Sequence, residues 1–215
     1  MANRVGKGLV AKKVGMTRMY DANGAMVPVT VLKIEDQRVT KILNSERDGY
    51  SGYQVGYFEK SEKNLTLADR KRLRNVSVED NFARFCEFRT NEPVADLELG
   101  AKLGADLFKE CVSIDVTGVT KGRGYQGSVK RWGSAIGRMT HGSRFHRRPG
   151  SLGSNTTPGR VFKNKKQPGQ YGNDVCTLTN LSVVKVDETK NIVVIKGSIP
   201  GHSNGYVRIR PTNRA

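Results

Sequence analysis

The clearest fold signal in the chain is the stretch MTRMYDANGAMVPVTVLKI, residues 16–34, in which apolar residues alternate with polar ones around Asn23-Gly24. Asn-Gly between alternating apolar residues is the strongest short-range sign of a β-hairpin, because both residues tolerate the positive φ angles of a tight turn. The stretch therefore predicts a strand, a turn and a second strand.

Other stretches along the chain also favour strands. They are YQVGYF (53–58), CVSIDVTGV (111–119), YVRIRP (206–211) and VCTLTNLSVVKVDETKNIVVIKGSI (175–199), the last read as two strands joined at residues 188–191. Thr66 and Asp69 have the spacing of a helix capping box, so we expect a short basic helix over residues 66–74. Many short strands separated by turn signals predict a mainly β fold built on a small β-barrel.

Charge is the second strong signal. The 215 residues carry a formal net charge of +17, with a pI of about 10.0, which indicates a polyanionic partner such as RNA, DNA or an anionic membrane surface. Residues 116–173 contain no Asp or Glu and hold 12 of the 37 Lys and Arg residues, which leaves 25 basic against 20 acidic residues elsewhere. These twelve are Lys121, Arg123, Lys130, Arg131, Arg138, Arg144, Arg147, Arg148, Arg160, Lys163, Lys165 and Lys166.

The same acid-free segment has the composition of an extended loop. It holds 12 of the 24 glycines and three of the seven prolines, and no helical or strand period persists beyond a few residues. A solvated face and low-complexity disorder are the alternatives to a binding function. Aromatic residues interleaved with the bases favour order in the presence of a nucleic-acid partner: Trp132, Phe145, Phe162 and Tyr171. We therefore expect an excursion between two barrel strands.

Within this segment, KGRGYQG (121–127) has the G-x-G-x-x-G spacing of dinucleotide-binding folds. Such a site also needs an acidic residue about 20 positions further on, and the next acidic residue here is Asp174. This disfavours an NAD-linked enzyme. The glycines instead let backbone N–H groups, Lys121 and Arg123 approach phosphates closely, or form a strained turn at the barrel's edge.

The sequence shows no assembled catalytic, metal or cofactor site. Cys86, Cys111 and Cys176 are far apart and lack zinc-ligand spacing, so they are expected to be reduced core thiols. His141 and His146 have no carboxylate in their segment to orient an imidazole, which favours RNA contact over catalysis. The sequence has no run of 18 or more apolar residues, so we expect no membrane span. The N-terminus lacks a signal-peptide pattern, so we expect a cytosolic protein without a removed leader.

Four motifs in order carry a family resemblance: GLVAKKVGMTRMYDANGAMVPVTVLKI, IDVTGVTKGRGYQGSVKRWG, MTHGSRFHRRPGSLGSNTTPGRVFKNKKQPGQYGN and NIVVIKGSIPG. Together they resemble the universal large-subunit ribosomal protein L-three family in its bacterial form. The likeness runs nearly end to end and is weakest between about residues 60 and 106.

The resemblance implies a β-barrel like those of translation factors and a long basic loop. It implies that the loop binds 23S-type rRNA early in subunit assembly, with a tip at about residues 147–157 that approaches the peptidyl transferase centre. It also implies neighbouring large-subunit proteins as partners, a cytoplasmic location, and neither a cofactor nor enzyme activity. Some bacterial relatives carry a methylated glutamine in the tip, but Ser154, Asn155 and Thr156 stand here, so that modification is not carried over.

We expect the chain to divide into the first part of the barrel (1–60), a surface insertion with a short helix (61–106), a barrel strand (107–120), the extended rRNA-binding loop (121–173) and the final part of the barrel (174–215). Trp132 fits a packing anchor at the loop's root as well as it fits base stacking. A general RNA-binding chaperone is the alternative function. The candidate rRNA-binding residues are Lys12, Lys13, Arg18, Lys121, Arg123, Lys130, Arg131, Trp132, Arg138, His141, Arg144, His146, Arg147, Arg148, Ser151, Asn155, Arg160, Lys163, Lys165 and Lys166.

Overall fold

The chain forms two compact units. A computed structural model describes residues 7–21, 23–75, 80–91 and 97–212. The first unit consists of Met1–Val119 together with Val175–Ala215, and the second is Thr120–Asp174. The second unit therefore interrupts the first in sequence.

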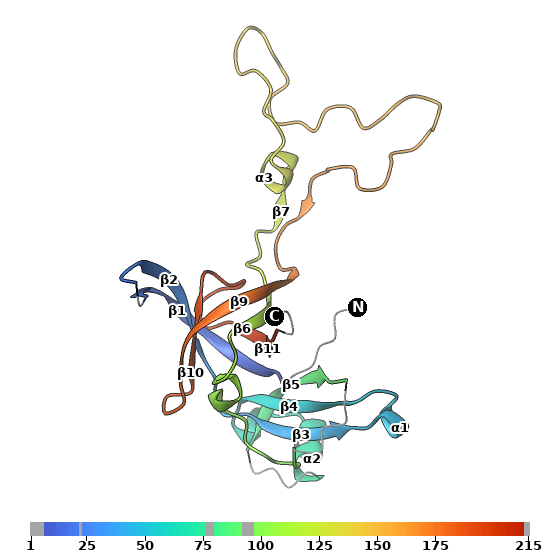
Figure 1. Cartoon of the computed structure of the whole chain (residues 1–215). Helices are drawn as coiled ribbons and strands as arrows, with labels where there is room; N and C mark the ends of the chain where they lie inside the picture. The colour runs from blue at the N-terminus through green and yellow to red at the C-terminus, as the bar shows by residue number, and fades with distance from the viewer. Residues whose placement is uncertain (1–6, 22, 76–79, 92–96, 213–215) are drawn as a thin grey trace. The chain divides into compact units, whose positions relative to one another are not determined.

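Six strands of the first unit close into an antiparallel barrel in the order β1-β11-β6-β9-β10-β2 (Figure 1). The strands are β1 (Leu9–Tyr20), β2 (Met26–Lys33), β6 (Ser113–Val119), β9 (Val175–Asp187), β10 (Ile192–Lys196) and β11 (Tyr206–Pro211). The hairpin between β1 and β2 turns at Asn23-Gly24, where Gly24 has a φ of 75°. The structure thus confirms the predicted hairpin, the mainly β class and the barrel.

A second sheet lies in the first unit outside the barrel, with the strand order β3-β4-β5. Its strands are β3 (Arg38–Leu43), β4 (Gly52–Glu59) and β5 (Phe82–Arg89). Two expectations are corrected here. Residues 1–60 form not only barrel strands but also β3 and β4 of the second sheet, and residues 61–106 are more than a surface insertion. They supply β5, whose Phe82 and Phe88 are fully buried.

One core is continuous between the barrel and the second sheet. Tyr53 of β4 stacks on Phe88 of β5 with ring centroids 5.6 Å apart, and both join a buried cluster with Leu9 and Val10 of β1. The Tyr53 hydroxyl donates a hydrogen bond of 2.7 Å to the carbonyl oxygen of Gly8. Burial of these rings fixes the second sheet against the barrel, because each large apolar side chain removed from water contributes about 1.5–3 kcal/mol.

Short helices complete the first unit: α1 (Ser45–Asp48), η1 (Glu62–Asn64), α2 (Leu67–Asn75) and η2 (Ala105–Phe108). The predicted cap of α2 is present, since the Asp69 amide donates to the Thr66 hydroxyl at 3.2 Å and that hydroxyl donates to the Asp69 carboxylate at 2.6 Å. The predicted basic helix over residues 66–74 is therefore confirmed.

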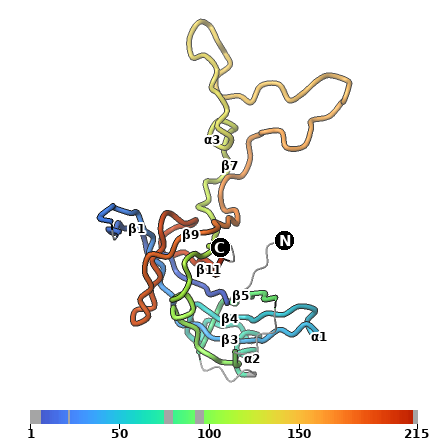
Figure 2. The backbone as a smooth tube through the Cα atoms, in the orientation of Figure 1, coloured from blue at the N-terminus to red at the C-terminus, as the bar shows by residue number. Residues whose placement is uncertain are grey.

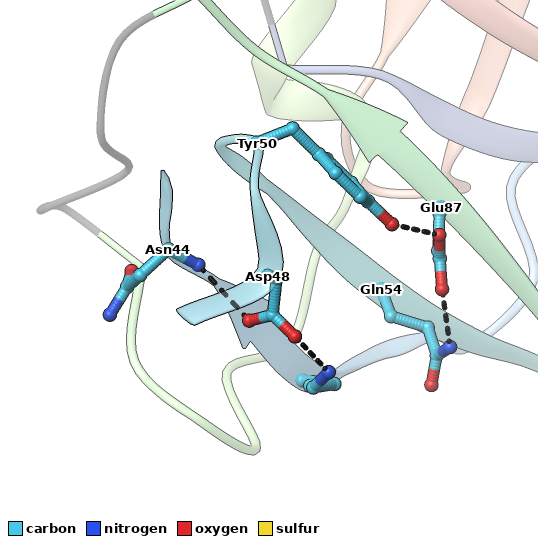
Figure 3. Close-up of polar contacts among 6 residues, drawn as sticks. Asn44, Asp48, Tyr50, Gln54 and Glu87 are labelled. Carbon is cyan, nitrogen blue, oxygen red and sulfur yellow. Dashed lines mark hydrogen bonds and ion pairs between the residues drawn. The ribbon is translucent and has the colours of Figure 1, made fainter. Parts of the chain in front are cut away.

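Exposed polar contacts organise the other face of the second sheet (Figure 3). The Tyr50 hydroxyl and the Gln54 amide donate to the two oxygens of Glu87 at 3.0 and 3.1 Å, respectively. Next to them, Asp48 accepts an ion-pair contact of 2.7 Å from Lys41, which lowers the pKa of the carboxyl. These contacts are solvent-exposed, so each contributes little to the stability of the fold.

Candidate nucleic-acid interface

The second unit begins and ends in a stem of two paired chain segments. β7 (Tyr125–Gln126) pairs antiparallel with β8 (Gly169–Gln170). Beside this ladder the Arg123 amide donates to the Tyr171 carbonyl at 2.9 Å, and the Thr120 amide donates to the Asp174 carbonyl at 2.9 Å. The unit starts and ends within one residue of the loop expected at 121–173, and the stem brings its two ends together.

A single turn of helix fastens the two segments of the stem. In α3 (Ser128–Trp132), the guanidinium of Arg131 and the indole N–H of Trp132 both donate to the carbonyl oxygen of Gln167, at 3.0 and 2.9 Å. The guanidinium also lies over the indole ring, 4.9 Å from its centroid. Of the two roles considered for Trp132, the structure supplies the contacts of the anchor, while 44% exposure of its side chain leaves ring surface for stacking.

The hydrogen bond from the Trp132 indole to Gln167 can be tested by mutation. Trp132→Phe keeps an aromatic ring, though a smaller one, and removes the N–H donor, at a net cost of about 1 kcal/mol for one hydrogen bond. We expect roughly fivefold faster hydrogen exchange at the Arg123 and Tyr171 amides, measured by NMR on the whole chain. Tyr125→Phe, at a 75% exposed ring, is the control. Equal exchange in the two variants would show that the indole N–H does not fasten the stem.

Beyond the stem the backbone makes open excursions between α3 and β8 (Figure 2). One is closed by the Gly137 amide, which donates to the His146 carbonyl at 2.8 Å, and by the contact of 3.1 Å between His146 Nδ1 and the Arg138 carbonyl. A Cβ at Gly137 would overlap Phe145, so glycine is required for this closure. Residues 147–166 are all exposed, and Ser128 and Gly172 are the only buried residues of Thr120–Asp174.

The basic side chains of this unit are available to an anion. Eleven of the twelve are exposed and Arg131 is half-buried, and none takes part in an ion pair within the described ranges. The guanidiniums of Arg123 and Arg160 lie over the rings of Tyr171 and Phe162, 5.2 and 5.5 Å from the centroids. Stacking of this kind orders an arginine while leaving its N–H edge free for phosphate. His141, His146, Ser151 and Asn155 lie along the same excursions.

The three barrel residues of the predicted set differ from one another. Lys12 forms an ion pair of 2.9 Å with Glu35, and Arg18 is exposed. Lys13 is only 8% exposed, and its ammonium donates to the carbonyls of Ile199 and Gly201 at 2.9 and 3.1 Å. Lys13 is therefore a structural lysine, and we remove it from the proposed contacts. The sequence pattern that could have predicted the burial of Lys13 is the strand alternation of Leu9, Ala11 and Lys13, which directs all three side chains inward.

Within the described residues, the structure does not support a metal site, a reactive cysteine or a membrane-spanning helix. No group of three or more His, Cys, Asp or Glu side chains there is arranged to hold a metal ion. All three cysteines are free; Cys86 is buried and the other two are half-buried, and burial raises the pKa of the Cys86 and Cys111 thiols, which opposes a reactive thiolate. No described helix has the length and apolar character needed to cross a bilayer.

A small β-barrel unit whose chain is interrupted by an exposed, acid-poor basic segment is typical of a nucleic-acid-binding protein. The comparisons with known proteins agree. The family model described as "Ribosomal protein L3" matches residues 91–191.

Curated relatives match almost the whole chain. The large ribosomal subunit protein uL3 of Alkaliphilus metalliredigens is 43% identical over 96% of this chain and 97% of its own length. Those of Thioalkalivibrio sulfidiphilus and Geobacter sulfurreducens are 42% and 44% identical over 97% and 96% of this chain, and over 98% and 97% of their own. The chain belongs to the large ribosomal subunit protein uL3 family, in its bacterial form. It is a structural constituent of the large ribosomal subunit and not an enzyme.

Proposed function

We propose that this protein binds 23S-type rRNA directly, early in large-subunit assembly, and that the second unit makes the main contact. The observation that carries the proposal is that eleven of the twelve Lys and Arg side chains of the loop are exposed, and that none of the twelve has an acidic partner within the described residues. A narrow backbone with these side chains can enter between closely spaced phosphates where a folded domain cannot. Arginine suits bidentate phosphate contacts and stacking on bases, and lysine acts as a point charge.

We propose that the two ends of the loop and its tip have different roles. Arg123, Lys130 and Arg131 lie in or beside the stem, and Lys163, Lys165 and Lys166 lie shortly before β8 in sequence. These six are proposed to bind phosphates along the entry path. Arg147, Arg148, Ser151 and Asn155 surround Pro149-Gly150 and contact rRNA beside the peptidyl transferase centre. Neighbouring large-subunit proteins in the cytoplasmic ribosome are the further partners.

Co-sedimentation in high salt tests this function. The protein should be recovered in stoichiometric amount with large ribosomal subunits after pelleting through about 0.5 M salt, where purely non-specific phosphate contacts weaken strongly. A general RNA chaperone would be washed off and would bind unrelated RNAs equally well. An NAD-linked enzyme would bind the nucleotide and be absent from the pellet.

Replacement of two charges at the tip tests the division of labour. Arg147→Ala with Arg148→Ala should leave subunits that sediment normally, because most phosphate contacts remain. Their peptidyl-transfer rate, or their response to drugs bound at that centre, should change about two- to tenfold, because loss of the two positive charges should alter the coupling between the tip and that centre by about 0.5–1.5 kcal/mol. The matched loss at Lys165 and Lys166 should instead slow incorporation into subunits. Normal sedimentation together with wild-type behaviour in both assays would contradict a functional tip.

A further inference from the structure

The first unit contains a cavity that the loop-based function leaves unused. Its volume is about 480 Å³, within the usual range for small-ligand sites. The last residue of β2, the turn between β9 and β10, the end of β4 and the start of β11 all contribute to its wall. Its lining includes Lys12, Lys33, Glu35, Phe58, Lys190 and Tyr206, and we call the site the β2–β10 pocket.

Three lysines and three carboxylates line the β2–β10 pocket, namely Lys12, Lys33 and Lys190 with Glu35, Asp36 and Glu59. Glu35 is engaged by Lys12 at 2.9 Å and by the Tyr206 hydroxyl at 2.6 Å. Burial raises the pKa of Glu35, but these two hydrogen bonds and the charges of Lys12 and Lys33 outweigh it, so the pKa is lowered and the group is ionised at neutral pH. With Glu35 committed in this way, no ion pair in the described ranges uses Lys190 or Lys33.

Two other carboxylates line the pocket. Asp36 is paired with Lys102 at 2.9 Å, which leaves Glu59 as the acidic group without a lysine among the described ion pairs. In the strand register Lys12 of β1 lies directly opposite Lys33 of β2, and Glu35 already offsets the charge of Lys12.

Phe58 gives the pocket an aromatic wall in an unusual conformation. Its φ is 63°, a left-handed value that is rare and costly for a bulky residue and that persists only where the surroundings hold it. The surroundings here are Tyr206, edge-on with centroids 5.8 Å apart, and the Arg84 guanidinium 5.1 Å from the Phe58 centroid. The ring is thus ordered before any ligand arrives.

We propose that the β2–β10 pocket receives one unpaired nucleotide of RNA. The base packs against Phe58 and Tyr206, and its phosphate lies near Lys33 and Lys190. An aromatic wall beside two lysines that form no ion pair within the described ranges suits an unstacked base and its phosphate in single-stranded RNA. The inference rests on the proposed function, since the basic loop brings the chain to rRNA, and it adds a contact made by the first unit.

Affinity measurements with matched variants test the pocket. The probe is a transcript of the 3′ part of 23S-type rRNA, bound by the full-length protein. Lys33→Gln with Lys190→Gln should weaken binding about tenfold. Lys185→Gln with Lys196→Gln removes two exposed lysines of β9 and β10 that do not line the pocket, and should weaken it less than threefold. Equal effects of the two double variants would overturn the proposal.

Phe58→Gly provides a variant that should fold. Glycine accepts the left-handed conformation without strain, so the lost packing is partly offset. Loss of one stacking partner should weaken RNA binding roughly 5- to 100-fold, with the circular dichroism spectrum unchanged. Wild-type affinity in a folded Phe58→Gly protein would exclude the aromatic wall from RNA binding. If the wild-type protein itself did not bind the transcript, the proposed function would fail and not merely this inference.

Photo-crosslinking identifies the occupant. A benzophenone amino acid at Thr189, an exposed residue of the pocket, is built into the chain and irradiated in assembled large subunits. A crosslink to a single rRNA nucleotide is expected. A crosslink to a protein, or none above the unirradiated control, would refute the assignment. Titration with GMP covers a free nucleotide: saturation below about 0.1 mM, with RNA affinity unaffected by the lysine pair, would assign the pocket to a soluble ligand instead.

Discussion

Replacement of residues 121–172 by a short Gly-Ser linker is expected to remove most of the protein's affinity for rRNA while the barrel stays folded. The barrel should survive because β6 and β9 pair as far as Val119 and Val175, directly before and after the loop. The loop ends are also close, since the Asn173 amide donates to the Thr120 carbonyl at 3.2 Å. A short linker can therefore close the gap without strain.

The size of the loss follows from counterion release. Each phosphate neutralised contributes about −0.7 to −0.9 to the slope of log affinity against log salt. If the loop engages about six phosphates, its removal should flatten the slope by about 4–5 and weaken binding by at least about a hundredfold at moderate salt. Filter binding of the rRNA transcript over a salt series measures both quantities.

Lys185→Gln with Lys196→Gln is the control, since it removes two barrel charges and leaves the loop intact. An unchanged slope in the loop-deleted protein, with the melting temperature preserved, would move the binding surface to the barrel. Arg18 and Lys12 would then be the first residues to test.

Gly172→Ala is expected to open the stem of the second unit and, through it, to impair incorporation into subunits. Gly172 has a φ of 71°, and a Cβ there would overlap the carbonyl oxygen of Lys121. The left-handed conformation alone costs a non-glycine residue about 1–2 kcal/mol. The overlap with backbone atoms adds to this, so we expect a total of roughly 3 kcal/mol or more, enough to disrupt a ladder of two residue pairs.

Gly124→Ala separates the two contributions. Gly124 has a similar φ of 66°, but nothing lies within 4 Å of a Cβ placed there. It should therefore cost only the conformational 1–2 kcal/mol. Hydrogen exchange at the Arg123 and Tyr171 amides should reach the unprotected rate in Gly172→Ala and rise about 5- to 30-fold in Gly124→Ala. If both variants exchanged alike, backbone overlap at Gly172 would have no part in holding the stem.

The individual strands and the basic loop follow from local patterns. Asn23-Gly24 marks the first hairpin, Thr66 and Asp69 mark the start of α2, and the run YVRIRP coincides with β11. The absence of acid over residues 116–173 marks the candidate interface without any reference to structure. Such features are readable because turn chemistry, capping and charge act over a few neighbouring residues.

The second sheet is different, because β3 and β5 exist through tertiary contacts. In β5 the run FARFCEFR places Phe82, Cys86 and Phe88 inside, but Phe85 and Ala83 on the other side obscure the alternation. Its assignment depends on pairing with β4 and on the shared core with β1. β-propensity reflects mainly such neighbours, and a single sequence does not reveal them.

Side-chain roles divide in the same way. The sequence by itself determined that a basic, acid-free loop interrupts a β-barrel and that its charges need a polyanion. Only the tertiary structure decided which basic side chains are free. It buried Lys13 against two carbonyls, bound Arg131 and Trp132 to Gln167, and placed Lys33, Lys190 and Phe58 in the lining of one pocket. The physical reason is distance, since a charge becomes a ligand contact or a structural bond according to which atoms the fold places within about 3 Å of it.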